Sequence, residues 1–127
     1  MNKRIVKPAK APQPVGPYNQ AVVANNLVYT AGQIPLDPVT NEMVTGGITE
    51  QVKQVLLNLK AVIEGAGSSL EKVMKTTVFL KDMNDFPAMN AVYSQFFEAS
   101  TAPARSTIQV ARLPKDALVE IEAVALV

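Results

Sequence analysis

The chain has 127 residues, of which 48% are apolar and 18% charged, and its formal net charge at pH 7 is +1. These values are typical of one globular domain, here residues 1–127, with enough apolar side chains for a core of its own. The sequence contains no histidine and no cysteine. Their absence excludes a Ser-His-Asp triad, a cysteine nucleophile, the usual zinc sites and disulfide bonds, so acid–base chemistry must use Asp, Glu, Lys, Tyr or a bound water.

A near-neutral charge gives no electrostatic reason to expect a nucleic-acid partner. Neither of the two common glycine-rich nucleotide-binding motifs occurs in the sequence. Lys3, Arg4, Lys7 and Lys10 cluster near the N-terminus, and we interpret the cluster as a solvated tail rather than a binding arm. Prolines interrupt this segment, unlike the apolar region of a signal peptide, and no apolar run reaches membrane-spanning length. We therefore predict a cytoplasmic protein that binds neither nucleic acid nor membranes.

The first predicted elements are two short strands joined by a tight turn. Residues 21–24 and 27–31 are apolar runs, and the Asn25-Asn26 pair between them is typical of two-residue hairpin turns. Residues 33–47 follow without periodicity and contain two prolines and two glycines. A loop this long in a compact domain is often functional or packs over another part of the chain.

The middle of the chain predicts a helix, a strand and a second helix. Apolar residues at helical spacing predict a helix over residues 48–63, which Gly65-Ala66-Gly67 ends. Residues 73–81 alternate in the manner of a strand. The residues that share one face of this strand are Met74, Thr76, Val78 and Leu80. The second helix is expected to take Asn84 as its N-cap and to bury apolar residues between 86 and 97.

Two apolar strands close the chain, so the predicted order is ββαβαββ: an α+β fold with both helices packed on one face of the sheet. Val78, Ile108 and Ile121 are expected on the covered face. The other face would also carry apolar side chains, for which no helix remains, and we therefore predict an obligate homo-oligomer whose sheets pack together. Polar groups of that same open face, Arg105 and Glu120 among them, would line cavities between subunits.

Arg105 and Glu120 are the candidates for chemistry, because isolated charges in otherwise apolar strands are costly unless they are paired or useful. Arg105 could bind a carboxylate through its planar fork, or it could form a structural ion pair with Glu120 or another acid. Glu120 could act as a general base or be a paired interface carboxylate. Glu122 shares the face of Glu120, and periodicity does not choose between them.

Eight short segments follow one another over nearly the whole chain: Gly16-Pro17-Tyr18, Thr30-Ala31-Gly32-Gln33-Ile34-Pro35-Leu36, Asn58-Leu59-Lys60-Ala61, Lys75-Thr76-Thr77-Val78-Phe79, Asn84-Asp85-Phe86, Pro103-Ala104-Arg105-Ser106, Val110-Ala111-Arg112-Leu113-Pro114 and Val119-Glu120-Ile121-Glu122-Ala123. In this order they carry a resemblance to the RidA (YjgF) family. The resemblance implies a chorismate-mutase-like fold with a mixed sheet, assembled as a homotrimer with three clefts between subunits. It also implies hydrolytic deamination of reactive enamines and imines (2-aminoacrylate/2-iminopropanoate and 2-iminobutanoate) to 2-keto acids and ammonia, without metal or organic cofactor.

The same resemblance implies roles for individual residues. Arg105 would bind the substrate carboxylate, and Glu120 would position the attacking water and transfer protons. Tyr18 and Asn90 would contact the ligand, and the N–H of Gly32 would hold a substrate oxygen. From the residues alone, a tyrosine after Gly-Pro is more often a packing lid than a catalytic acid, and Asn90 is equally well explained as an amide at the edge of an apolar stripe.

Two positions depart from the family pattern. Ala31 stands where many members carry a serine, and Thr107 where a cysteine is common; both leave the preferred substrate open. An alternative function is a non-catalytic module that binds a small ligand or a partner protein at the same clefts. Ribonuclease activity is a third, weaker candidate, against which the near-neutral charge and the lack of histidine argue.

Overall fold

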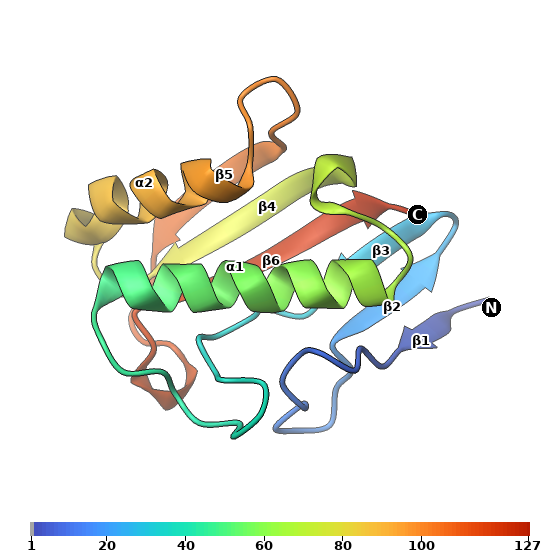
Figure 1. Cartoon of the computed structure of the whole chain (residues 1–127), viewed down its shortest axis with the longest axis horizontal. Helices are drawn as coiled ribbons and strands as arrows, with labels where there is room; N and C mark the ends of the chain where they lie inside the picture. The colour runs from blue at the N-terminus through green and yellow to red at the C-terminus, as the bar shows by residue number, and fades with distance from the viewer. Residues whose placement is uncertain (1) are drawn as a thin grey trace.

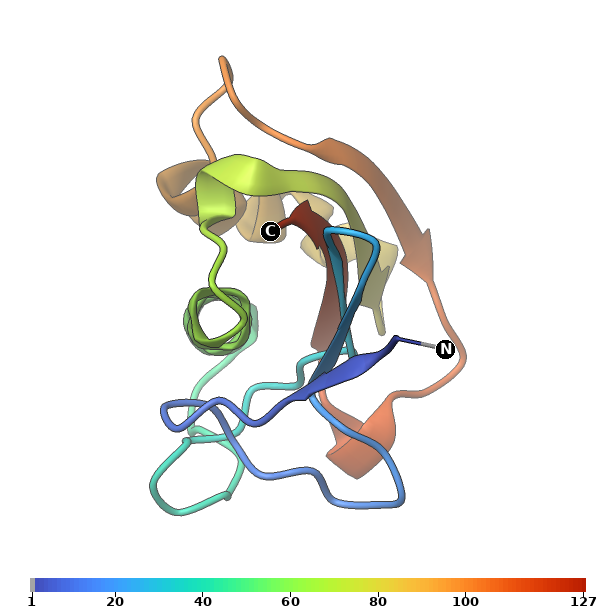
Figure 2. The ribbon, with the colours of Figure 1, turned by 90° about the vertical axis from the view of Figure 1, so that its right-hand side faces the viewer.

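The computed structural model describes residues 2–127 as one sheet with two helices packed on one of its faces (Figures 1 and 2). The elements in chain order are β1 (Arg4–Val6), β2 (Ala21–Ala24), β3 (Leu27–Thr30), α1 (Ile48–Gly65), β4 (Val73–Leu80), α2 (Phe86–Phe96), β5 (Ala104–Gln109) and β6 (Val119–Leu126). The strands lie in the order β1-β2-β3-β6-β4-β5, with β4 and β5 parallel and all other pairs antiparallel. The predicted mixed α+β sheet is therefore confirmed. No helix among these residues is both long enough and apolar enough to cross a membrane.

The N-terminal segment is not the solvated tail that the sequence predicted, because Arg4–Val6 forms an additional edge strand. It pairs antiparallel with β2, from Arg4 opposite Val23 to Val6 opposite Ala21. Val6 is buried, and the Arg4 guanidinium donates a hydrogen bond to the carbonyl of Ala66 (3.2 Å). Burial of an apolar side chain and pairing of backbone groups outweigh the solvation of a short basic stretch. The observed order is therefore βββαβαββ.

The predicted hairpin between β2 and β3 is confirmed. Asn25 and Asn26 both have positive φ (51° and 64°). A two-residue turn with two left-handed residues is of type I′, whose twist matches that of the strands it joins, and asparagine tolerates this conformation better than most residues.

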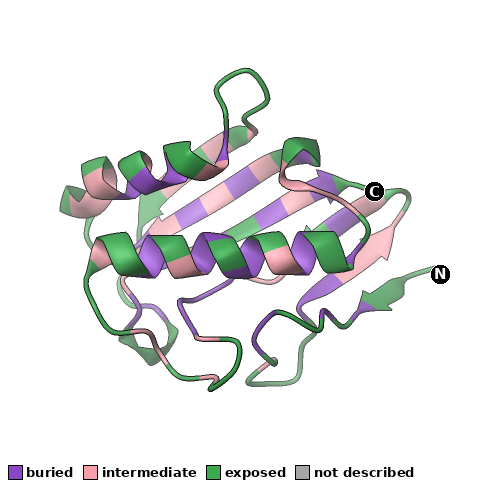
Figure 3. Ribbon diagram, in the orientation of Figure 1, coloured by how far each residue is buried: buried purple, intermediate pink, exposed green. Residues whose placement is uncertain are grey.

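Both helices turn their apolar faces to the sheet, where the buried residues lie (Figure 3). At the start of α1, the N–H of Gly47 donates to the carboxylate of Glu50 (2.8 Å), which satisfies one end group of the helix. The expected N-cap of α2 is wrong. Asn84 lies inside a 3-10 turn, Met83–Asp85, because the Asp82 carboxylate accepts the N–H of Asn84 (2.9 Å) and starts that turn two residues earlier.

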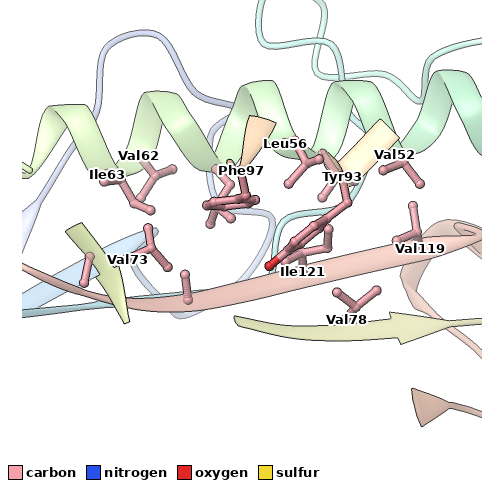
Figure 4. Close-up of a cluster of buried hydrophobic side chains, with 14 of the residues drawn as sticks. Val52, Leu56, Val62, Ile63, Val73, Val78, Tyr93, Phe97, Val119 and Ile121 are labelled. Carbon is pink, nitrogen blue, oxygen red and sulfur yellow. The ribbon is translucent and has the colours of Figure 1, made fainter. Parts of the chain in front are cut away.

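In β4 the predicted alternation holds from Thr76 to Leu80 but not at Met74. A register shift against β6 lies between Val73 and Lys75, and it buries Val73 while leaving Met74 half exposed. An extra residue in one strand of a pair reverses the alternation on its far side. The core between helices and sheet is otherwise continuous (Figure 4).

The loop after β3 packs over the end of the sheet, which is one of the two roles that its length predicted. Ile34 and Leu36 form a second small core with Leu113 and Ala117. The buried amide of Asn58, on α1, donates to the carbonyls of Ile34 (3.3 Å) and Leu36 (2.8 Å). This side chain therefore ties the loop to the first helix.

Candidate functional site

A bulge after β3 brings Gly32 against Glu120. Tyr29 pairs with Val124, and the next bridge joins Gln33 to Ile121, so the β3 side advances four residues while β6 advances three. Gly32 lies in this bulge, and a Cβ built on it would lie 2.6 Å from the carboxyl carbon and from Oε2 of Glu120. Only glycine leaves room for the carboxyl group at this place.

The Glu120 carboxyl group is half-buried on the sheet face that no helix covers. Burial raises its pKa, and the charge of Glu122 on the same face raises it further. Within residues 2–127 it has no ion-pair partner, and the N–H of Gly32 beside it makes no hydrogen bond. The pair thus offers a basic oxygen and a free backbone donor next to each other.

Two buried glutamines hold the bulge in place. The side-chain amide of Gln33 donates to the side-chain oxygen of Gln20 (2.7 Å), whose own amide donates to the carbonyl of Pro12 (2.7 Å). The backbone carbonyl of Gln20 accepts the N–H of Ala31 (2.8 Å). The burial of these two glutamines was not predicted, since an isolated Gln carries no sequence pattern that marks it as buried.

Arg105 lies in β5 on the opposite face, beside α2. Its cross-strand neighbour in β4 is Thr76, which points into the core. The guanidinium carbon lies 4.6 Å from the ring centroid of Tyr93 and 5.4 Å from that of Phe86. Arg105 and Asn90 line one hollow of about 470 Å³ at the end of α2. A cation over aromatic faces keeps its N–H groups free for an anion.

The expectation that Arg105 and Glu120 share a face is therefore wrong within one chain. Glu120 stands opposite Phe79 in the sheet, and Phe79 stands opposite Ile108, so these three side chains share the open face. Arg105, an odd number of residues from Ile108, points the other way. The error came from taking the apolar Ile108 as a mark of the helix side, whereas it is 45% exposed on the open face.

The structure also leaves Arg105 without the ion pair that was its structural alternative. The one ion pair within residues 2–127 joins Arg112 to Asp116, both exposed. Within the part of the chain that the structure describes, the Arg105 guanidinium contacts two aromatic rings and forms no ion pair.

Two of the remaining predicted residues lie beside the Gly32–Glu120 pair or beside Arg105 and Asn90, and a third lies apart from both. Thr107 shares the face of Arg105 and stands opposite Val78, and Ala31 adjoins Gly32. Tyr18 lies apart from both: its hydroxyl accepts the N–H of Val15 (3.2 Å) within the segment that joins β1 to β2. It lines a separate hollow of about 410 Å³. No group of three Asp or Glu side chains in residues 2–127 is placed to hold a metal ion.

The model of the family described as endoribonuclease L-PSP, the RidA (YjgF) family, matches residues 8–127. The chain belongs to this family. A RutC family protein of Synechocystis is 59% identical over 99% of this chain and 98% of its own. A 2-iminobutanoate/2-iminopropanoate deaminase of Dermatophagoides farinae is 50% identical over 98% and 97%.

Among solved structures, TdcF of Escherichia coli with bound serine superposes with a TM-score of 0.91 at 44% identity, covering 98% of each chain. The resemblance stated from the sequence motifs is thus confirmed, and so is the fold that it implied.

Proposed function

We propose that this RidA-family chain hydrolyses small 2-imino acids to 2-keto acids and ammonia. The observation that carries the proposal is the Arg105 guanidinium, which is held on two aromatic rings and has no carboxylate partner in residues 2–127. A guanidinium presented in this way suits the two oxygens of a substrate carboxylate. The deaminase name of several relatives, at 46–50% identity, supports the same substrate class.

The opposite orientation of Arg105 and Glu120 favours a site shared by two chains. One subunit would supply Arg105 and Thr107 from the edge strand β5 and Asn90 from α2, and its neighbour would supply Gly32 and Glu120. Apolar side chains on the open face leave it suited to such packing, and those that remain large and exposed there are Tyr29, Ile108 and Leu126. With closed cyclic symmetry, each copy would contribute one of each half. We propose the homotrimer that the family resemblance implies, with Tyr18 closing each cleft.

The reaction needs one water and a group that moves protons. The water oxygen bonds to C2 of the protonated imine, and Glu120 takes the proton that this water loses. Glu120 then gives the proton to the nitrogen, and the C–N bond breaks. The remaining hydroxyl loses its proton to the Glu120 carboxylate as the C=O bond forms. An enamine such as 2-aminoacrylate first becomes the imine by gaining a proton at C3 and losing one from nitrogen. Carbon, nitrogen and protons balance: imine plus water gives keto acid plus ammonia.

The raised pKa of Glu120 suits this task. A carboxyl group whose pKa lies nearer neutrality both accepts a proton from water and returns it to nitrogen more readily than an ordinary carboxylate. The free N–H of Gly32 would donate to an oxygen of the substrate or of the intermediate. The cytoplasm, where pyridoxal-phosphate enzymes release such imines, is the compartment that we propose.

The test is an assay in which a pyridoxal-phosphate-dependent serine dehydratase releases 2-aminoacrylate in situ and ammonia or pyruvate is followed. We expect wild type to accelerate product formation, and Arg105→Ala and Glu120→Gln to lose this effect. Arg112→Ala is the matched control, because it removes an exposed arginine outside both groups. Equal rates with and without wild-type protein would reject the proposal.

The serine bound in the solved relative favours a second candidate, a module that binds small amino or keto acids without turnover. Ligand binding at Arg105 with no acceleration in the same preparation would select it. Ribonuclease activity, which the family description names, gains no support from the site: the chain has no histidine, and its net charge is +1.

A further inference from the structure

Tyr93 belongs to the core, and its hydroxyl points towards the sheet (Figure 4), while the Arg105 guanidinium carbon lies 4.6 Å from its ring centroid. The side chain is only 6% exposed, and its hydroxyl shares a hydrogen bond of 2.7 Å with Oγ1 of Thr76, which is fully buried. Thr76 is also the cross-strand neighbour of Arg105. Three residues from β4, β5 and α2 therefore form a closed set of contacts: strand pairing, a hydrogen bond and a cation–π contact.

This set fixes the guanidinium without consuming its donors. The rings of Tyr93 and Phe86 attract the cation through their faces, whereas a carboxylate partner would occupy the N–H groups that a ligand needs. The long side chain of an arginine otherwise loses considerable rotamer freedom when a ligand fixes it. Holding Arg105 in place beforehand removes part of that loss from the binding step.

The hydroxyl of Tyr93 is placed to orient its ring and not to act on a ligand. Its partner Thr76 is fully buried and does not line the hollow, whereas Tyr93 itself lines it together with Arg105 and Asn90. Burial raises the pKa of Tyr93, so the group stays a neutral phenol in the range where the protein works. A rotating or absent ring would leave the guanidinium free to move along the hollow.

We propose that Tyr93, oriented by Thr76, is a positioning residue that holds Arg105 ready for a carboxylate ligand. The inference rests on the proposed function only for the identity of that ligand, a 2-imino or 2-keto acid. It assigns a binding role to a side chain that the sequence marked only as part of the apolar stripe of α2. The competing role is core packing alone, which the experiment below separates from positioning.

The test measures the affinity of the full-length chain for pyruvate, a 2-keto acid that needs no turnover, by NMR titration. Tyr93→Leu removes the ring, and we expect binding about 3- to 30-fold weaker, the range for a lost cation–π contact. Tyr93→Phe keeps the ring and should stay closer to wild type. The matched control is Val92→Ala, a buried residue of the same helix that does not line the hollow; it should lower Tm without changing the affinity.

A second pair of variants keeps the test open if Tyr93→Leu does not fold. Thr76→Ser retains the hydroxyl and should bind pyruvate like wild type, whereas Thr76→Val removes it and should bind about 2- to 10-fold more weakly. In the imine assay, the same loss should appear in KM, with kcat nearly unchanged, because the carboxylate contact is equal in ground and transition states.

Three results would overturn the inference. One is wild-type affinity for pyruvate in Thr76→Val, or in Tyr93→Leu where that variant folds. The second is a loss of affinity in Val92→Ala equal to that in Tyr93→Leu. The third is pyruvate binding that is absent from wild type or survives Arg105→Ala. Failure of the proposed function looks different, since pyruvate would then bind through Arg105 and Tyr93 while the imine assay showed no acceleration.

Discussion

Glu120 rests on the backbone of Gly32, close enough that one methyl group on that glycine would occupy the place of the carboxyl group. The bulge after β3 makes this approach possible, and the buried pair Gln20 and Gln33 fixes the bulge. The orientation of the proposed base is therefore set by a residue that has no side chain of its own.

Gly32→Ala is expected to fold but to lose activity. The new Cβ would force the Glu120 carboxyl group away, because contacts of 2.6 Å cannot persist. Loss of general acid–base action costs about 10²–10⁴-fold in rate, and we expect a fall in kcat within that range in the imine assay. Gly47→Ala is the control, since the nearest atom to its Cβ would be 3.9 Å away. Full activity in Gly32→Ala would show that Glu120 need not lie where it does.

The activity of the wild type should rise with pH as Glu120 loses its proton, with the midpoint above the ordinary glutamate value of 4.5. Glu122→Gln removes the second cause of the raised pKa and should move the midpoint to lower pH. A pH profile of kcat/KM for both proteins measures this. An unchanged or higher midpoint in Glu122→Gln would contradict the assignment of Glu120 as the base.

Glu120→Gln is expected to be more stable than wild type at neutral pH while it is inactive. A carboxyl group with a raised pKa in the folded chain stabilises the fold below its unfolded pKa, and this contribution is lost as pH rises through the folded pKa. The glutamine variant avoids that loss. Urea unfolding at about pH 7.5 and at about pH 3.5 should show a gain in the first condition that disappears in the second.

Ile108→Glu is expected to fold as a monomer of 13.6 kDa without activity. Ile108 lies on the open face, 45% exposed, next to Phe79 in the sheet. A charge there would have to be buried if another copy covers this face. Light scattering gives the mass, and Val39→Glu, at a loop position 91% exposed, is the control. An intact, active oligomer in Ile108→Glu would place the subunit interface elsewhere.

Two inactive variants should restore activity when they assemble together. If Arg105 and Glu120 come from different subunits, a trimer that mixes Arg105→Ala and Glu120→Gln chains at equal ratio would have about one intact site in four. Co-refolding followed by the imine assay tests this, with each variant refolded alone as control. Persistent inactivity of a verified mixed oligomer would mean that Arg105 of one subunit and Glu120 of another do not act in one site.

The sequence predicted most of the fold because most elements obey local rules. The Asn25-Asn26 turn and the apolar period of α1 need no distant partner to be recognised. The strand Arg4–Val6 was missed because three residues with a basic flank carry no strand pattern; only pairing with β2 makes them a strand.

The candidate site was harder to predict than the fold. Periodicity correctly separated Arg105 from Ile108, but it could not say which side the helices would cover. That depends on where α2 packs relative to an edge strand, which is a tertiary property. The roles of Tyr93 and Gln20 were invisible for the same reason, since each depends on a partner far away in the chain: Thr76 for the first and Gln33 for the second.

The last strand of the fold, β6, lies in the interior of the sheet between β3 and β4. Before β6 is added, no backbone hydrogen bonds join the two halves of the sheet. One half is β1–β3 with α1, and the other is β4 and β5 with α2. Until β6 inserts, Glu120 has no Gly32 to rest on, and the apolar surfaces of both pieces stay open to other chains. The placement of Glu120 against Gly32 and the joining of the two halves of the sheet thus coincide in one late folding step.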